Sequence, residues 1–269
     1  MKASQPLAWI FLACTPALLC KARAAEVDAR PADRLAFSAN GVRLVDVDDG
    51  GGGSLNYLHY LKPDVLIGVG AEHQFIADSK WTFGSLRGAY GFGAPETKTT
   101  LYGELHAGGG DEDGRNFDYG VGVLGVTRSF GRKFSVQLET RQIEVDRSTG
   151  NLPKLGLTYF WSPQWSTNIA YAKSVSGNLG TELTSGRIDH YGRGMNFFIG
   201  GAAGSAAPVV LNLQPGITLP VSNLKEGFAG LGKTFSFGEL QLVGDYLESG
   251  DNERITVYVN FTASFPRKP

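Results

Sequence analysis

Apolar and polar residues alternate with a period of two along most of the chain. In ITVYVNFTASF, residues 255–265, Ile, Val, Phe and Ala occupy one parity, while Thr, Tyr, Asn and Ser occupy the other. Such alternation predicts a β-strand with one apolar and one polar face. From residue 34 onward similar segments follow one another, separated by turn residues. The predicted strands cover 34–46, 54–62, 65–76, 81–92, 97–108, 117–130, 134–146, 152–161, 165–175, 182–191, 195–203, 224–237, 239–248 and 253–265.

The connections between these strands alternate between two kinds. One kind is tight and often flanked by aromatic residues, as in the Gly-Arg pair at 131–132. The other is mostly longer and polar, as in GGGDEDGRN at 108–116 and DRSTGN at 146–151. Short turns at one end and longer loops at the other are typical of an outer-membrane β-barrel. Counting 204–223 as one loop gives an even number of strands, about 14, and directs the last strand toward the short-turn end.

Alternation alone does not tell which face meets water, but the predicted size favours a polar interior. A closed barrel of about 14 strands with its apolar face inward would enclose a void too wide for side chains to fill. In VLIGVGAEHQF, residues 65–75, the parity opposite the apolar one carries Gly, Glu and Gln, which suits a water-facing lumen. The prediction is an all-β, transmembrane, antiparallel up-and-down β-barrel of about 14 strands, with 12 or 16 as alternatives. A secreted β-sandwich is the soluble alternative.

Aromatic residues gather beside the tight turns, as in the interfacial girdle of a membrane barrel. The residues predicted for a periplasmic girdle are Tyr60, Phe92, Phe130, Phe134, Trp161, Trp165, Tyr191, Phe237 and Phe265.

The N-terminus has the pattern of a cleaved export signal. Lys2 precedes an apolar run over 7–19, and Ala22-Arg23-Ala24 places small residues at the two positions that a signal peptidase recognises. Both cysteines fall within this signal, so the processed chain would contain no disulfide. The predicted organisation is a signal peptide 1–24, an N-terminal segment 25–33, a barrel 34–265 and a C-terminal tail 266–269.

Composition supports a turn-rich β protein and argues against nucleic-acid binding. The 37 glycines are about twice the usual share, and the formal net charge of -1 comes with dispersed Lys and Arg. A nucleic-acid-binding domain would need a clustered basic surface. The glycine strings at 68–74 and 120–126 lie within strands and do not open a helix, so they do not form a phosphate loop. They are expected to face the lumen or to ease barrel curvature.

With the apolar parity facing lipid, the opposite parity supplies candidate lumen residues. Arg87 is assigned inward although the alternation along 81–92 is poor. These side chains could form a structural network of ion pairs, or they could set selectivity for a polar or charged solute. The candidates are Glu72, Gln74, Arg87, Tyr102, Glu104, His106, Gln137, Glu139, Arg141 and Asn260.

The sequence offers little for metal binding or catalysis. The four histidines do not stand in a metal-ligand spacing, and no cofactor is expected. Outer-membrane hydrolases use Ser-His or Asp-His groupings near the loop end, for which His73 with Ser79 and His106 with Asp111 or Asp113 are the nearest candidates. None of these matches a known signature, so an enzyme is the least favoured reading.

Two resemblances point to the bacterial outer membrane. The segment 255–265 resembles the C-terminal strand by which outer-membrane barrels engage the barrel-assembly machinery, with Phe265 as its aromatic end, although Pro266–Pro269 follow it. The segments GVTRSFGRKFSVQLETRQIEV, DHYGRGMNFFIGGAAGSAAP and GDYLESGDNERITVYVNF are similar in strand rhythm and Tyr-Gly turns to the YaiO family of outer-membrane barrels. The resemblance implies outer-membrane lipid and the assembly machinery as partners and carries no functional residues.

Three functions are consistent with this pattern. The first is a pore, or an export-associated channel with envelope export partners, for small polar solutes or polysaccharide. The second is a structural barrel, plugged by its own side chains or by 204–223, that partners an envelope assembly. The third is an enzyme that modifies envelope lipid.

Overall fold

The computed structural model describes residues 33–44, 49–76, 79–112, 114–145, 148–192, 194–206, 222–250 and 252–265. The predicted signal peptide, nearly all of the N-terminal segment and the C-terminal tail lie outside the described residues. So does most of the predicted loop 204–223, of which the structure describes the first and last residues as strand.

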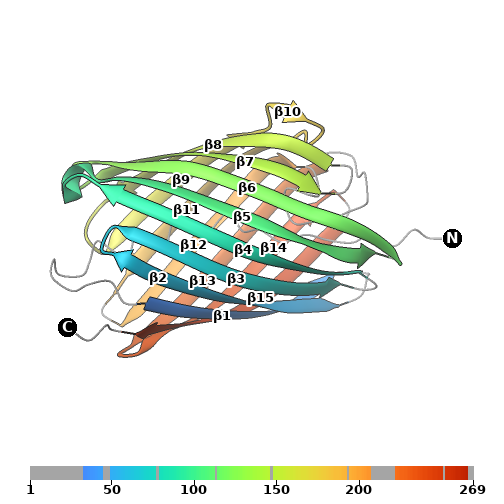
Figure 1. Cartoon of the computed structure of the whole chain (residues 1–269), viewed down its shortest axis with the longest axis horizontal. Coiled ribbons are helices and arrows are strands. Elements are labelled where there is room, and N and C mark those ends of the chain that lie inside the picture. Colours follow the sequence, from blue (N-terminus) through green and yellow to red (C-terminus); the bar gives the residue numbers. More distant parts are fainter. Residues whose placement is uncertain are drawn as a thin grey trace.

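Fourteen long strands form one closed antiparallel barrel, which confirms the predicted fold class (Figure 1). Each strand pairs with the next, β8 pairs with β9, and β15 returns to pair with β1. The strands are β1 Asp33–Leu44, β2 Gly50–Lys62, β3 Val65–Ile76, β4 Ser79–Phe92, β5 Thr99–Glu112, β6 Arg115–Phe130, β7 Phe134–Val145, β8 Ser148–Phe160, β9 Trp165–Lys173, β11 Glu182–Tyr191, β12 Met195–Ala206, β13 Ser222–Phe235, β14 Gly238–Ser249 and β15 Asn252–Phe265. Two short elements lie in connections, the 3-10 turn η2 Pro95–Thr97 and the strand β10 Ser176–Gly177.

The first and last strands close the barrel in full register. Their pairing runs without interruption from Asp33 opposite Phe265 to Leu44 opposite Arg254. Both ends of the described barrel therefore lie at the same end as the tight turns, as an even strand number requires. No helix in the described residues is long and apolar enough to cross a membrane.

The predicted difference in connection length holds for some connections and fails for others. The two longest, 174–181 between β9 and β11 and 207–221 between β12 and β13, lie at the expected long-loop end. At the expected long-loop end only two residues separate β3 from β4, β5 from β6, β7 from β8, and β14 from β15. At the opposite end six residues separate β4 from β5. The polar stretch 108–116 forms the paired ends of β5 and β6, where Gly110 lies opposite Phe117, because glycine-rich polar sequence can still extend a backbone ladder. The two ends are called here the short-turn end and the long-loop end.

The outer surface of the barrel is apolar, which excludes the soluble sandwich. Each long strand exposes at least one large hydrophobic side chain, and Leu124 is 69% exposed. A continuous apolar surface of this extent needs lipid around it. Representative residues, one from each strand, are Phe37, Leu55, Val69, Leu86, Leu105, Leu124, Leu138, Leu155, Ile169, Ile188, Ile199, Leu231, Leu242 and Val257.

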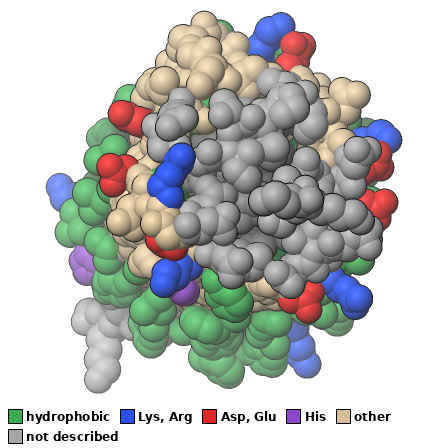
Figure 2. All heavy atoms as spheres, turned by 90° about the vertical axis from the view of Figure 1, so that its right-hand side faces the viewer, with side chains coloured by type: hydrophobic (Ala, Val, Ile, Leu, Met, Phe, Trp, Pro, Cys, Tyr) green, Lys and Arg blue, Asp and Glu red, His purple; other side chains and the backbone are tan. Residues whose placement is uncertain are grey.

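Charged side chains mark the edge of this apolar belt at the long-loop end. Figure 2 looks onto that end and shows basic and acidic side chains spread around the rim. Lys173 Nζ lies 2.8 Å from Glu182 Oε2, and Lys225 Nζ lies 3.0 Å from Glu248 Oε1.

The pairing of β8 with β9 is incomplete at the long-loop end. Toward the long-loop end, the last pair of the β8–β9 ladder is Lys154 opposite Ala172. The residue that precedes Lys154 in β8 is Pro153, which has no N–H to donate. Beyond it the connection from β9 to β11 covers the edge of β8: β10 pairs with Gly150 and Asn151. The proline thus ends β9 early, at nine residues.

Closure of the backbone ladder predicts that the folded barrel resists unfolding by detergent until it is heated. Purified protein should run at different apparent masses on a detergent gel before and after boiling. A single band at the same position in both lanes would contradict a closed barrel.

Candidate functional site: the barrel lumen

The inward parity of the strands forms three tiers along the barrel axis. Near the long-loop end the inward side chains are apolar and almost fully buried, and Leu179 from the β9–β11 connection is 0% exposed against Ile143 and Val145. This group is called the apolar tier and comprises Val42, Trp81, Phe117, Ile143, Val145, Leu152, Leu179, Leu183, Leu224 and Leu247. The predicted polar lumen therefore does not extend to this end, where Ile143, Val145 and Leu179 pack against one another.

The middle of the barrel carries a network of ion pairs. Arg141 Nε lies 2.7 Å from Glu139 Oε1, and Tyr102 Oη donates to Glu139 Oε2 at 2.7 Å. Gln137 Nε2 donates to the same tyrosine oxygen at 2.5 Å. Lys154 is also buried here, and its charge acts on Glu139. This cluster ties β5, β7 and β8 together through buried groups that satisfy one another.

A second part of the network joins β4 and β5. Arg87 Nε lies 3.7 Å from Glu104 Oε2, and His106 Nε2 lies 3.1 Å from the same oxygen. One carboxylate thus faces two basic side chains on the lumen wall.

Two further pairs lie on the strands of the other half. Arg187 Nη2 lies 2.5 Å from Asp189 Oδ1, and the guanidinium carbon of Arg187 lies 3.8 Å from the centroid of the Phe198 ring. Arg254, 0% exposed, lies 2.9 Å from Asp245. Charge inside the barrel is therefore arranged mainly in compensated pairs.

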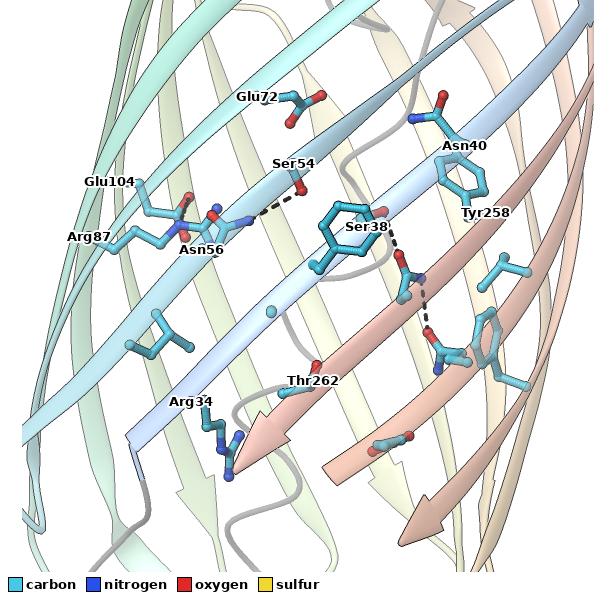
Figure 3. A pocket seen from close by; sticks show the side chains of 18 of the residues that line it. Arg34, Ser38, Asn40, Ser54, Asn56, Glu72, Arg87, Glu104, Tyr258 and Thr262 are labelled. Carbon is cyan, nitrogen blue, oxygen red and sulfur yellow. Dashed lines mark hydrogen bonds and ion pairs between the residues drawn. The ribbon is translucent and has the colours of Figure 1, made fainter. Parts of the chain in front are cut away.

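Hydroxyl and amide side chains prevail toward the short-turn end and across the closing seam. Figure 3 shows this wall, where Ser38 Oγ donates to Asn260 Oδ1 at 2.6 Å and Arg34 points into the lumen below them. Other inward groups at this end are Ser129, Ser135, Ser166, Asn196, Thr262 and Ser264.

A cavity of about 500 Å³ occupies the middle and short-turn tiers. Its lining reaches from Phe83 and Tyr119 down to Ser236 and Ser264, and Ile143 is the one apolar-tier residue in it. No described residue of β8 or β9 contributes, so the cavity lies against the wall that includes the β1–β15 seam. The strands thus hold a cavity next to the apolar tier, lined by charged and hydrogen-bonding side chains and also by apolar ones such as Phe83, Val123 and Phe228.

Inward glycines let large rings lie flat along the wall. A Cβ at Gly125 would overlap the ring of Tyr102, and one at Gly230 would overlap the ring of Phe198. Phe228 occupies the same position over Gly200. Rings that fill these hollows do not project into the lumen, which leaves room for the cavity.

Nine of the ten residues predicted for the lumen line this cavity. The tenth, Gln137, is buried beside it and bonds Tyr102 and Glu139. Arg87, on a strand with poor alternation, also points inward. Whether these side chains meet a passing solute stays a prediction.

The predicted aromatic girdle differs from the structure at two positions. Tyr191 lines the cavity because it shares the inward parity of Asp189. Tyr60 has the parity of the inward Leu58 and is only partly exposed, next to the bulge between Tyr60 and Lys62. The others are exposed on the outer surface or in the turns: Phe92, Phe130, Phe134, Trp161, Trp165, Phe237 and Phe265.

The candidate catalytic groupings do not assemble. His73 points outward and lies 2.7 Å from Thr82 Oγ1, whereas Ser79 is buried on the inward parity. His106 faces the lumen and Asp111 lies on the opposite parity of β5, while Asp113 is outside the described residues. No cluster of three metal-ligating side chains occurs among the residues that the structure describes.

Several lumen residues escaped the sequence analysis although their signal was present. In β11, Arg187 and Asp189 share one parity, but the opposite parity carries Thr184 and Gly186, so neither face is clearly apolar. Glu226 and Asp245 line the cavity from β13 and β14. Alternation places them inward once Leu231 and Leu242 are assigned to lipid.

Similar solved structures share the fold. The structure titled "CymD monoaromatic hydrocarbon channel" superposes with a TM-score of 0.63 at 12% identity, over 94% of this chain and 92% of that one. The toluene transporter TodX of Pseudomonas putida gives a TM-score of 0.54 at 10% identity, over 99% and 96%. The outer membrane protein Omp33 of Acinetobacter baumannii gives 0.51 at 9% identity, over 87% and 98%.

No protein-family model matches the chain, and no curated protein matches it in sequence. The resemblance to the YaiO family therefore stays an expectation.

The tyrosine that joins Gln137 to Glu139 should stabilise the barrel measurably. Tyr102→Phe removes a buried hydroxyl that both donates and accepts, and the free energy of unfolding should fall by about 1–3 kcal/mol. Urea unfolding in lipid vesicles measures this. Tyr90→Phe, an exposed outer-surface position, is the control and should change stability by less than about 0.5 kcal/mol. Equal losses in both variants would contradict the structural role of the network.

Proposed function

We propose that the chain is an outer-membrane channel that admits small polar solutes into its lumen. The observation that carries this proposal is the cavity of about 500 Å³ inside a barrel with an apolar exterior, whose lining places charged and hydrogen-bonding side chains among apolar ones. Polar groups at such positions can bind hydrated solutes. The proposal places the protein in the bacterial outer membrane, delivered there through its C-terminal strand by the barrel-assembly machinery.

Two of the similar structures are described as carrying aromatic hydrocarbons. In this chain a hydrocarbon would meet the apolar tier first and then the ion pairs of Arg141 and Arg187. Hydrocarbons gain nothing from such groups, whose hydration they would displace. Polar solutes are therefore the favoured class. The cavity suits small solutes better than a polysaccharide chain, because the apolar tier covers one end.

One observation favours a second candidate, a closed structural barrel. The apolar tier contains side chains with exposures of 0% or 1%, among them Leu152, Leu179 and Leu247. A lumen blocked at this tier would leave the barrel as an anchor for an envelope assembly.

Conductance tests the channel directly. The reconstituted protein should give discrete current steps in a planar lipid bilayer, and a silent membrane at high protein concentration would contradict the proposal. Arg34→Glu reverses a charge in the cavity wall at the short-turn end, so the reversal potential in a KCl gradient should shift toward the potassium equilibrium potential. Arg43→Glu, on the outward face of the same strand, should leave the reversal potential unchanged.

Truncation of the apolar tier separates the two candidates. Leu179→Ala together with Leu247→Ala removes bulk from the constriction, so a conducting barrel should show larger current steps. A barrel that is silent as wild type and conducts only after these substitutions is the closed structural barrel. The shift on boiling verifies that both proteins are folded.

A further inference from the structure

Five polar side chains form one row across the seam where the barrel closes. The strand register places Gln241 opposite Asn260, Asn260 opposite Ser38, Ser38 opposite Ser54, and Ser54 opposite Glu72. Adjacent strands lie about 4.8 Å apart, so the row extends across the wall over roughly 19 Å. It is called here the polar strip, and all five of its residues line the cavity.

The hydrogen bonds within the polar strip do not use all of its donors and acceptors. Ser38 Oγ donates to Asn260 Oδ1 at 2.6 Å, and Asn260 Nδ2 donates to Gln241 Oε1 at 3.4 Å. An amide group has two hydrogens and a carbonyl oxygen with two lone pairs, so each of these amides has further donors or acceptors for a solute. Beside the strip, Asn40 Oδ1 is buried without a hydrogen-bond partner among the described residues. The wall is thus rich in neutral groups that both donate and accept.

The strip differs from the rest of the cavity in its charge. Four of its five members are uncharged, whereas the rest of the lining includes ion pairs such as Arg141 with Glu139. Within the strip itself, Glu72 is the one charged side chain. Tyr258 lies next to the strip, opposite Asn40, and it lines the cavity with an aromatic ring (Figure 3). An aromatic face packs well against the C–H face of a saturated ring whose edge carries hydroxyl groups.

We infer that the polar strip with Tyr258 is a binding site for a small neutral polyhydroxylated solute, of the size of a monosaccharide or disaccharide. Hydroxyl groups on such a solute donate and accept in alternation, which matches amides and hydroxyls in one row. Glu72 at the end of the strip adds an acceptor for a hydroxyl hydrogen. This inference rests on the proposed channel function and names the class of solute that the lumen selects.

The test uses the full-length protein in a planar bilayer with D-glucose as the probe. Glucose added to the KCl solution should reduce the channel current in a saturable way, because a bound sugar obstructs the ions. Triethylene glycol is the matched solute, since it is neutral and of similar size but is an open chain with hydroxyl groups only at its two ends. At equal viscosity it should reduce the current only in proportion to bulk conductivity.

Asn260→Leu supplies the variant at the centre of the strip. It keeps a similar side-chain volume and removes the amide that bonds Ser38 and Gln241. The apparent affinity for glucose, measured as the fraction of the variant's own KCl current that glucose blocks, should fall about tenfold. Asn168→Leu is the control, because Asn168 also faces inward, on β9, but does not line the cavity. Its glucose response should equal that of the wild type.

The outcomes separate this inference from the function on which it rests. A conducting channel that responds equally to glucose and triethylene glycol would overturn the sugar site and leave the channel standing. So would an Asn260→Leu protein, verified as folded by its shift on boiling, that binds glucose as tightly as wild type. Absence of any KCl conductance would overturn the channel itself and the inference with it.

Discussion

The hydrogen-bonded closure of β1 against β15 is the constraint on which the rest of the structure depends. In lipid an unpaired backbone group costs several kcal/mol, so a sheet can span the bilayer only when its two edges meet. The uninterrupted register from Asp33–Phe265 to Leu44–Arg254 satisfies this requirement. Closing fourteen strands also fixes a bore wide enough to hold a cavity of about 500 Å³ between the inward side chains.

Inside the barrel, charged side chains and neutral polar side chains are distributed differently. Charges are placed beside opposite charges, as in Arg187 with Asp189, so their fields largely cancel within the wall. Neutral amides and hydroxyls are concentrated where β1 meets β15, the seam that no turn connects. The same side chains that hydrogen-bond across the seam are therefore the ones that a solute in the cavity would meet.

Strand parity was sufficient to predict the fold and much of the lumen, because alternation with a period of two is visible within each segment of the sequence by itself. It placed Glu139 and Asn260 inward, and it placed Tyr102 there too. It did not reveal that Leu179 folds inward from a connection, since that depends on how Pro153 ends the β8–β9 ladder. Nor could parity alone correct the assignment of Tyr191, because an aromatic residue near a tight turn suits either face.

The width of the lumen depends on the inward glycines over which aromatic rings lie. Tyr102 over Gly125 and Phe198 over Gly230 add apolar surface to the wall without narrowing the passage. The width of the lumen is then encoded at positions that carry no side chain at all. Substitution of such a glycine by alanine would displace the ring that lies over it toward the lumen. A single methyl group in the wall could therefore change which solutes fit.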